Sequence, residues 1–227
     1  MVVAGGRGER MRPATDAVPK PMLPLGGKPL LEHQLRWHKS SGFKEAFLCL
    51  GYKASAIQDR FADGSSLGIT LSYQVEKTPR GTAGAVRDLG LRGDLLVVYG
   101  DLYVDMDCGR LLDFHARHEG AATLVLRETD HPYDSDLARV EGERIAGFYR
   151  AKTGEPTDRL GLAAVWVTRP SLMELVPGDR PSDFGRDIFP KALAEGLALW
   201  GFRTAETVVD LGTPERCRDF ARRWKHA

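Results

Sequence analysis

The 227-residue chain has little cysteine, no long apolar run and almost no net charge. Its three cysteines, Cys49, Cys108 and Cys217, lie far apart and form no CxxC pair, which argues against a disulfide framework or a zinc site and favours a reducing, cytoplasmic setting. No run approaches the roughly 20 apolar residues of a membrane span, and no signal peptide is recognised, so we expect no membrane partner. The formal charge of +1 gives no global attraction for nucleic acid, so any cationic site must be local.

The chain contains no repeat, low-complexity tract or Ser/Pro linker, and its length suits a single domain over residues 1–227. The first half alternates short apolar runs with amphipathic patterns, which is typical of a doubly wound, mostly parallel α/β sheet of Rossmann-like type. We expect strands at 2–4, 45–52, 69–76 and 94–101 and helices at 29–42, 54–64 and 82–90.

The second half has a different pattern, typical of a smaller mixed subdomain. We expect strands at 122–129, 137–151, 160–168 and 197–204 and helices at 182–196 and 212–226. The second of these strand ranges reads as a hairpin that turns at Glu141-Gly142-Glu143. In doubly wound sheets, ligands bind at the carboxyl ends of the strands. The glycine loop after Ala4 and the carboxylate of Asp101 are both expected there.

The stretch "AGGRGERMRP", which begins at Ala4, places glycines and arginines directly behind the first strand. Glycines let backbone N–H groups approach an anion closely, and the arginines that follow neutralise it. A Rossmann fingerprint needs a third small residue where Met11 stands, and no helix is expected to open there. A P-loop needs Ser or Thr after its Gly-Lys, where this chain has Pro29. The loop therefore predicts an anion site of another kind.

Four segments in order carry a resemblance to the sugar-1-phosphate nucleotidylyltransferases. They are the glycine loop with the Pro-Lys-Pro at 19–21, "VEKTPRGTAGA" at 75–85, "YGD" at 99–101 and "VVDLGTPE" at 208–215. The resemblance implies a GT-A-like fold, with a nucleotide-binding half over about 1–120 and a sugar-binding half over about 121–227. It also implies Mg²⁺-dependent transfer of a nucleoside monophosphate from a nucleoside triphosphate to a sugar 1-phosphate, with release of pyrophosphate. Because the chain ends soon after the last expected helix, we expect no appended hexapeptide β-helix.

The resemblance assigns the two candidate catalytic cations. Arg10 would stabilise the departing pyrophosphate, and Lys20 would contact the phosphate at the reacting centre. Pro19 and Pro21 fix the backbone on either side of that lysine, which lowers the entropy lost in placing it. No nucleophilic side chain is needed, because the sugar phosphate oxygen itself attacks the α-phosphate.

Asp101 and Asp210 resemble the family's Mg²⁺ ligands, and two carboxylates suffice for an ion that also binds phosphates and water. Asp105 and Asp107 compete with Asp101 for this role, although the Gly-Asp at a strand end favours Asp101. The simpler alternative makes Asp101 a turn residue and Asp210 the N-cap of the last helix.

The resemblance implies that the nucleotide is held by Ala4, Gly5, Gly6, Gly8, Glu76, Gly81 and Thr82. Glu76 and the backbone of Ala4, Gly5 and Gly81 would form the base and ribose pocket. The side chain of Glu76 occupies the position that faces the base edge in this family. An ionised carboxylate only accepts hydrogen bonds, and guanine presents two adjacent donors, so GTP is the favoured nucleotide. Two alternatives stay open, since Glu76 would also suit a loop or ribose contact and Gly81 a simple turn.

The sugar end departs from the family pattern. Lys152 fits the lysine that grips the sugar phosphate, but Ala151 and Thr153 replace its usual Glu and Pro neighbours, and the usual Asn-x-Gly is absent. The segments 131–136 and 181–190 most resemble guanylyltransferases for D-glycero-D-manno-heptose 1-phosphate or mannose 1-phosphate. The sugar candidates in them are Asp134, Asp136, Asp183 and Arg186, with the N-cap of the helix that begins at Phe184 as the simpler and favoured role of Asp183.

The expected partners are therefore a nucleoside triphosphate and a sugar 1-phosphate, the latter favoured as the heptose compound, with a homodimer left open. Two other functions remain as alternatives. One is a cytidylyltransferase for phosphocholine or a cyclitol phosphate, which shares the glycine loop and the Pro-Lys-Pro. The other is a non-catalytic subunit that senses nucleotide sugars, with a degenerate site.

Overall fold

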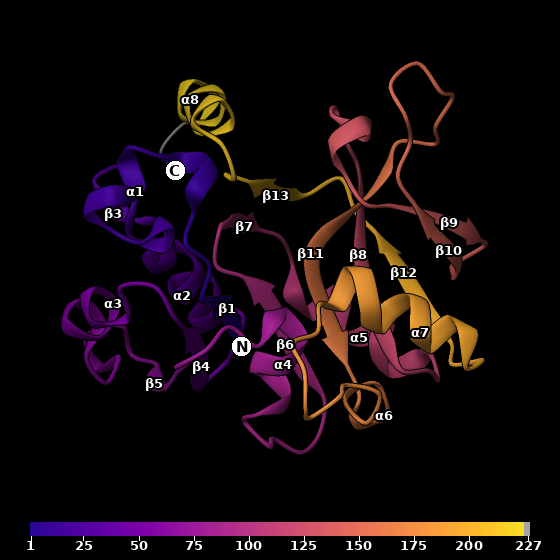
Figure 1. Ribbon diagram of the computed structural model, residues 1–227, viewed down its shortest axis with the longest axis horizontal. Helices are drawn as coiled ribbons and strands as arrows, with labels where there is room; N and C mark the ends of the chain where they lie inside the picture. The colour runs from indigo at the N-terminus through magenta and orange to yellow at the C-terminus, as the bar shows by residue number, and fades with distance from the viewer. Residues whose placement is uncertain (225–227) are drawn as a thin grey trace. The chain divides into compact units, whose positions relative to one another are not determined.

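The computed structural model describes residues 1–224, which divide into two units (Figure 1). The N-terminal unit comprises residues 1–79 and 98–106 together with the segment from 207 onward. The central unit comprises residues 80–97 and 107–206. The assignment of nucleotide and sugar binding to the two halves of the sequence stays a prediction.

The N-terminal unit is built on parallel strands. β1 (Val2–Ala4) pairs in parallel with β4 (Glu45–Leu50) and with the end of β6 (Leu95–Tyr99), and β4 pairs in parallel with β5 (Thr70–Val75). The four strands expected in this part of the chain are confirmed, each with slightly different bounds. Their parallel pairing gives the α/β, Rossmann-like character that the alternating pattern predicted.

Two predicted helices supply the apolar faces that cover this sheet. They are α2 (Leu30–Ser40) and α3 (Ala54–Phe61). The pairs Leu31/Leu35 and Ile57/Phe61, each spaced i, i+4, are buried in one cluster with β1, β4 and β5 residues. This packing fixes the end of β1, from which the glycine loop departs.

Short elements follow the glycine loop and close the unit. The 3₁₀ turn η1 (Glu9–Met11) opens directly after the loop, where no helix was expected. After it come α1 (Ala14–Ala17), η2 (Lys20–Met22), the hairpin β2 (Pro24–Leu25) with β3 (Lys28–Pro29), and η3 (Ser65–Leu67).

A second ribbon in this unit was not predicted. β7 (Leu102–Asp105) pairs antiparallel with β13 (Thr207–Asp210), and α8 (Pro214–Arg223) follows. The helix expected at 212–226 is thus confirmed over most of its range, and its residues 225 and 226 lie outside the described part of the chain. Leu25, Leu30, Leu211 and Phe220 form the apolar cluster beneath α8.

The central unit has a mixed sheet, in the order β11-β8-β12-β10-β9. Its strands are β8 (Ala122–Glu128), β9 (Leu137–Glu141), β10 (Arg144–Tyr149), β11 (Leu160–Thr168) and β12 (Leu199–Arg203). β12 runs parallel to β8, whereas β8 with β11, β10 with β12 and the predicted β9–β10 hairpin are antiparallel. This confirms the mixed character expected of the second half.

Several helices belong to the central unit. They are α4 (Gly81–Arg87), α5 (Cys108–Arg117), α6 (Pro170–Met173), the π-helical turn η5 (Phe184–Ile188) and α7 (Phe189–Ala194), with the 3₁₀ turn η4 at Pro132–Asp134. The helix expected at 182–196 is therefore a π turn that continues into α7. α5 and α6 were not predicted. Among residues 1–224, no helix combines the length and the apolar character needed to cross a bilayer.

We predict that Phe184→Ala lowers the free energy of unfolding by about 3–5 kcal/mol, the usual cost of removing a buried phenyl ring. Phe184 is fully buried, with its ring centroid 4.8 Å from that of Trp166 and 5.7 Å from that of Phe189. The measurement is urea unfolding followed by circular dichroism. Tyr133→Ala is the matched aromatic control, because Tyr133 is 45% exposed, and it should change stability by less than about 0.5 kcal/mol. Equal losses in the two variants would contradict this account of the core.

Candidate functional site

The glycine loop leaves β1 with its backbone held in a narrow space. A Cβ on Gly5 would lie 2.9 Å from Oε2 of Glu76, and a Cβ on Gly8 would lie 3.0 Å from the Thr15 side chain and 3.3 Å from that of Lys20. Gly8 also has a φ of +63°, which favours glycine. A Cβ on Gly6, by contrast, would meet nothing within 4 Å among the described residues. The loop is therefore packed at both ends and open in its middle.

Glu76 is placed by the end of β5. Its backbone N–H donates a hydrogen bond to the Leu50 carbonyl, with 2.8 Å between the nitrogen and oxygen. Ala4 is buried at the end of β1, and its neighbour Gly5 is the residue against which the Glu76 carboxylate rests. The structure thus brings together Ala4, Gly5 and Glu76, three residues predicted for the base and ribose.

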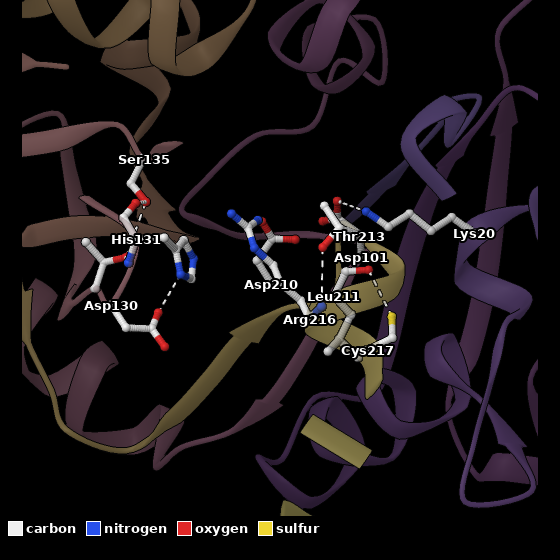
Figure 2. Close-up of polar contacts among 11 residues, drawn as sticks. Lys20, Asp101, Asp130, His131, Ser135, Asp210, Leu211, Thr213, Arg216 and Cys217 are labelled. Atoms are coloured by element: carbon white, nitrogen blue, oxygen red, sulfur yellow. Dashed lines mark hydrogen bonds and ion pairs between the residues drawn. The ribbon is translucent and has the colours of Figure 1, made fainter. Parts of the chain in front are cut away.

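Lys20 is buried and paired. Only 9% of its side chain is exposed, and its Nζ lies 2.6 Å from Oδ2 of Asp101 (Figure 2). Pro19, the residue before it, has a φ of −69°. Asp101 lies in the turn between β6 and β7. A buried ammonium group is tolerated when a carboxylate compensates it, so Lys20 and Asp101 each explain the position of the other.

Asp210 ends β13, where it pairs in register with Leu102, the residue after Asp101. The Leu211 N–H donates to the Asp101 carbonyl with 3.0 Å between the two atoms, which ties the two segments together. Asp210 Oδ2 forms an ion pair with Nη1 of Arg216 on α8 (Figure 2). Its other oxygen, Oδ1, is buried and accepts no hydrogen bond from any described residue.

Arg10, a third cation, lies beside Gly212 in this group. A Cβ built on Gly212 would lie 2.5 Å from Asp210 Oδ1 and 3.3 Å from Nη2 of Arg10. A side chain here would collide with the Asp210 carboxylate, so glycine allows that carboxylate and the exposed guanidinium of Arg10 to lie close to the backbone at 212. Arg10, Lys20, Asp101 and Asp210, predicted from distant parts of the sequence, all lie in the N-terminal unit around this loop and ribbon.

The simpler role suggested for Asp210, as N-cap of the last helix, is wrong. Thr213 caps α8, with its hydroxyl accepting from the Arg216 N–H at 3.3 Å. Of the competitors of Asp101, Asp107 is the N-cap of α5 and accepts from the N–H groups of Gly109 and Arg110. Asp105 is exposed at the end of β7.

Gly81, Thr82 and Asp183 lie together in the central unit. Gly81 has a φ of +71°, and a Cβ there would lie 2.3 Å from the Ser182 carbonyl oxygen, so a larger residue would not fit. The Thr82 hydroxyl donates to Asp183 Oδ2 at 2.9 Å and accepts from the Phe184 N–H at 3.0 Å. Asp183 Oδ1 accepts from the N–H groups of Gly185 and Arg186, which confirms the N-cap role.

The sugar candidates Asp134 and Lys152 are exposed. Asp134 belongs to η4 and lines a cavity of about 410 Å³ together with Tyr133, Glu155 and Arg159. The backbone N–H of Lys152 donates to Glu155 Oε2 at 2.9 Å, but its side chain is not among the residues that line this cavity. In the same loop region, His131 pairs with Asp130 (Figure 2). Roles for Asp134, Lys152 and Asp183 in sugar binding stay predictions.

Two residues of α8 were missed by sequence reasoning. Arg216 pairs with Asp210, as described above, and Cys217 is half-buried, with its thiol 3.3 Å from the Leu211 carbonyl oxygen. The signal that could have found them is their position in the first turn of a helix that begins four residues after a candidate metal ligand, Asp210.

The profile of the nucleotidyl transferase family matches residues 1–225. The chain belongs to the nucleotidyl transferase family. This confirms the family level of the resemblance that the four ordered motifs indicated. The parallel sheet with a glycine loop at the end of β1 is thus the scaffold of a nucleotidyl transferase.

Curated relatives of this nucleotidyl transferase match it over nearly its whole length. A protein from Mycobacterium tuberculosis named mannose-1-phosphate guanylyltransferase is 34% identical over 227 residues, covering 98% of this chain and 62% of the relative. A mannose-1-phosphate guanyltransferase from Pichia angusta is 27% identical, covering 95% of this chain and 61% of the relative. The chain therefore spans about three fifths of the length of these relatives.

Solved structures share the fold at lower sequence identity. A putative glucose-1-phosphate thymidylyltransferase from Bacillus anthracis has a TM-score of 0.85 at 21% identity, covering 100% of this chain and 96% of its own. HddC from Yersinia pseudotuberculosis has a TM-score of 0.81 at 21% identity, covering 99% and 98%. These similarities confirm the α/β nucleotidyltransferase fold.

We predict that Cys217 of this nucleotidyl transferase alkylates more slowly at pH 8 than free cysteine. Burial raises the pKa of its thiol, and the thiolate is the reactive form. A raised pKa leaves less thiolate at pH 8, so the labelling rate should still be rising with pH where that of free cysteine levels off. Iodoacetamide labelling followed by peptide mass spectrometry measures the rate, and Cys217→Ala identifies the peptide. Labelling at the free-cysteine rate at pH 8 would overturn this expectation.

Proposed function

We propose that the chain transfers a guanylyl group from GTP to a sugar 1-phosphate of manno configuration, releasing pyrophosphate. The observation that carries the proposal is the gathering of cations and carboxylates beside the glycine loop. Lys20 and Asp101 pair at 2.6 Å, Asp210 pairs with Arg216, and Arg10 lies beside Gly212. A site that joins two polyanions needs charge neutralisation and positioning rather than a protein nucleophile.

The choice of acceptor rests on the relatives. Two proteins that match nearly the whole chain are named for mannose 1-phosphate. The segments 131–136 and 181–190 favoured D-glycero-D-manno-heptose 1-phosphate as well, and the two sugars share the manno arrangement of ring hydroxyls. We therefore propose mannose 1-phosphate first and the heptose compound second.

Asp101 and Asp210 fit a Mg²⁺ ion. The buried Oδ1 of Asp210 has no hydrogen-bond donor among the described residues, and a Cβ on Gly212 would come within 2.5 Å of it, so glycine at this position accommodates the carboxylate. Both candidate ligands are hard carboxylate oxygens, as Mg²⁺ prefers. When bound, the ion would supply charge stabilisation to the phosphates at the reacting centre.

The reaction itself requires little beyond binding and orientation by this chain. A sugar phosphate oxygen attacks the α-phosphorus, a new P–O bond forms, and the bond to the bridging oxygen of the leaving pyrophosphate breaks. In our proposal, Lys20 holds the α-phosphate oxygens and Arg10 holds the departing pyrophosphate. The open middle of the loop at Gly6 lets backbone N–H groups approach the phosphates.

The test is pyrophosphate release from each of five nucleoside triphosphates with Mg²⁺ and a panel of sugar 1-phosphates. We expect turnover with GTP and a manno-configured acceptor. Asp101→Asn should lower turnover by about 10²–10³-fold or more, because a ligand and a partner of Lys20 are lost together. Asp105→Asn is the matched control, since Asp105 is an exposed aspartate at the end of β7.

Each other outcome of this panel has a defined meaning. Turnover with CTP and phosphocholine or a cyclitol phosphate would replace the proposal with a cytidylyltransferase. Nucleotide binding without turnover on any acceptor would favour a sensing subunit. Near-normal turnover by Asp101→Asn would show that the carboxylate is not a metal ligand.

A separate prediction concerns the base. Glu76→Gln should lower kcat/KM for GTP relative to ATP by about ten- to a hundredfold, because a neutral amide cannot accept two hydrogen bonds from the guanine edge as a carboxylate does. Competition between the two nucleotides at a fixed acceptor concentration measures the ratio. Glu45→Gln, an exposed position at the start of β4, is the control. An unchanged ratio would assign Glu76 to the loop or the ribose instead.

A further inference from the structure

The ion pair between Asp210 and Arg216 has no assigned role in the reaction proposed above. Arg216 lies in the first turn of α8, and only 16% of its side chain is exposed. Its Nη1 binds Asp210 Oδ2, while Oδ1 of the same carboxylate lies beside Gly212. One carboxylate oxygen therefore holds a guanidinium, and the other has no hydrogen-bond donor among the described residues.

The other candidate metal ligand is also paired with a cation. Asp101 Oδ2 is occupied by the buried ammonium of Lys20. Asp101 and Asp210 are thus each paired with a cation of the same chain, and both cationic side chains are largely buried. Such a site attracts a free divalent cation weakly, because the cation must displace a resident positive charge or share an oxygen with it.

The protein supplies few ligands of its own. In residues 1–224, no three His, Cys, Asp or Glu side chains are grouped closely enough to hold a metal ion. A Mg²⁺ ion bound to two carboxylates needs phosphates and water for its remaining positions. The same phosphates are also the preferred partners of a displaced guanidinium, which binds them in a bidentate manner.

We propose that Arg216 is the resident counterion of Asp210, so that the divalent cation enters with the nucleotide rather than before it. This inference rests on the proposed function. With a metal–nucleotide complex bound, Asp210 would hold the cation in place of Arg216, and Arg216 would donate to the phosphates beside Arg10. Arg216 therefore suppresses binding of the free cation and strengthens binding of the metal–nucleotide complex.

The test is Mn²⁺ binding to the whole chain without nucleotide, measured by electron paramagnetic resonance. Arg216→Met should tighten binding of free Mn²⁺ by about tenfold, since Asp210 loses its competitor. Arg216→Lys keeps the charge and should stay within about threefold of the wild type. Arg222→Met is the control. Like Arg216, Arg222 lies on α8 and pairs with an aspartate, here Asp219 at 3.6 Å, but its side chain is 77% exposed.

A second readout follows the nucleotide. Arg216→Met should raise the Kd of a non-hydrolysable GTP analogue in the presence of Mg²⁺ by about tenfold, and it should raise KM for GTP more than it lowers kcat. Opposite changes for free cation and for metal–nucleotide complex distinguish a counterion from a residue that only supports the fold, which would weaken both.

The outcomes separate the two levels of the proposal. If Arg216→Met and Arg216→Lys both bind free Mn²⁺ as the wild type does, the counterion role is wrong while guanylyl transfer stands. If Asp210→Asn abolishes the tight Mn²⁺ binding of Arg216→Met, the carboxylate is the ligand and the inference is supported. If no variant, nor the wild type, binds Mn²⁺ even with the GTP analogue, the proposed metal-dependent function fails and the counterion role fails with it.

Discussion

The pairing of Lys20 with Asp101 is the interaction on which the site depends. The Lys20 side chain is only 9% exposed, so its ammonium group would be costly to bury without a partner. Asp101 supplies that partner at 2.6 Å. In a chain with a net charge of +1, a cationic site must be assembled locally and must remain compatible with folding before any anion arrives. Pairing Lys20 with Asp101 and Arg216 with Asp210 achieves this, because a carboxylate separates these positive charges.

The ribbon formed by β7 and β13 places the two aspartates next to each other. Asp210 is opposite Leu102 in the ribbon, and the Leu211 N–H bonds to the Asp101 carbonyl, so two aspartates from distant parts of the sequence leave the same end of one ladder. The apolar cluster of Leu25, Leu30, Leu211 and Phe220 holds α8 against this end. The two carboxylates are thus positioned by backbone hydrogen bonds and apolar packing.

The sequence predicted the elements whose signals are local. Alternating apolar runs indicated the strands of the parallel sheet, and the Glu141-Gly142-Glu143 turn indicated the β9–β10 hairpin. The N-cap role, one of the two offered for Asp183, is confirmed, since Asp commonly accepts from the N–H groups of the first turn. At the candidate site, the family resemblance selected the glycine loop, Lys20, Asp101 and Asp210, which the structure places in one unit, and their chemical roles remain predictions.

The missed elements depend on partners that are remote in the sequence. β7 and β13 are each four residues long, and each forms a strand only because the other is present. One option made Asp210 the N-cap of α8. In the structure Asp210 is the last residue of β13, paired with Leu102, and Thr213 is the N-cap. α5 is a different case, because its cap Asp107 and the buried Leu111 and Phe114 at i, i+3 were visible in the sequence and were not used.

α8 shows what a closer reading of the sequence would have found. Phe220 is buried against the apolar cluster, and Arg216 is four residues earlier, on the same face of the helix. An arginine on the buried face of a helix keeps its stem in apolar surroundings, but its guanidinium needs a carboxylate or a phosphate within reach. The sequence therefore carried a requirement for an anion opposite Arg216. In the structure that anion is Asp210, the last residue of β13.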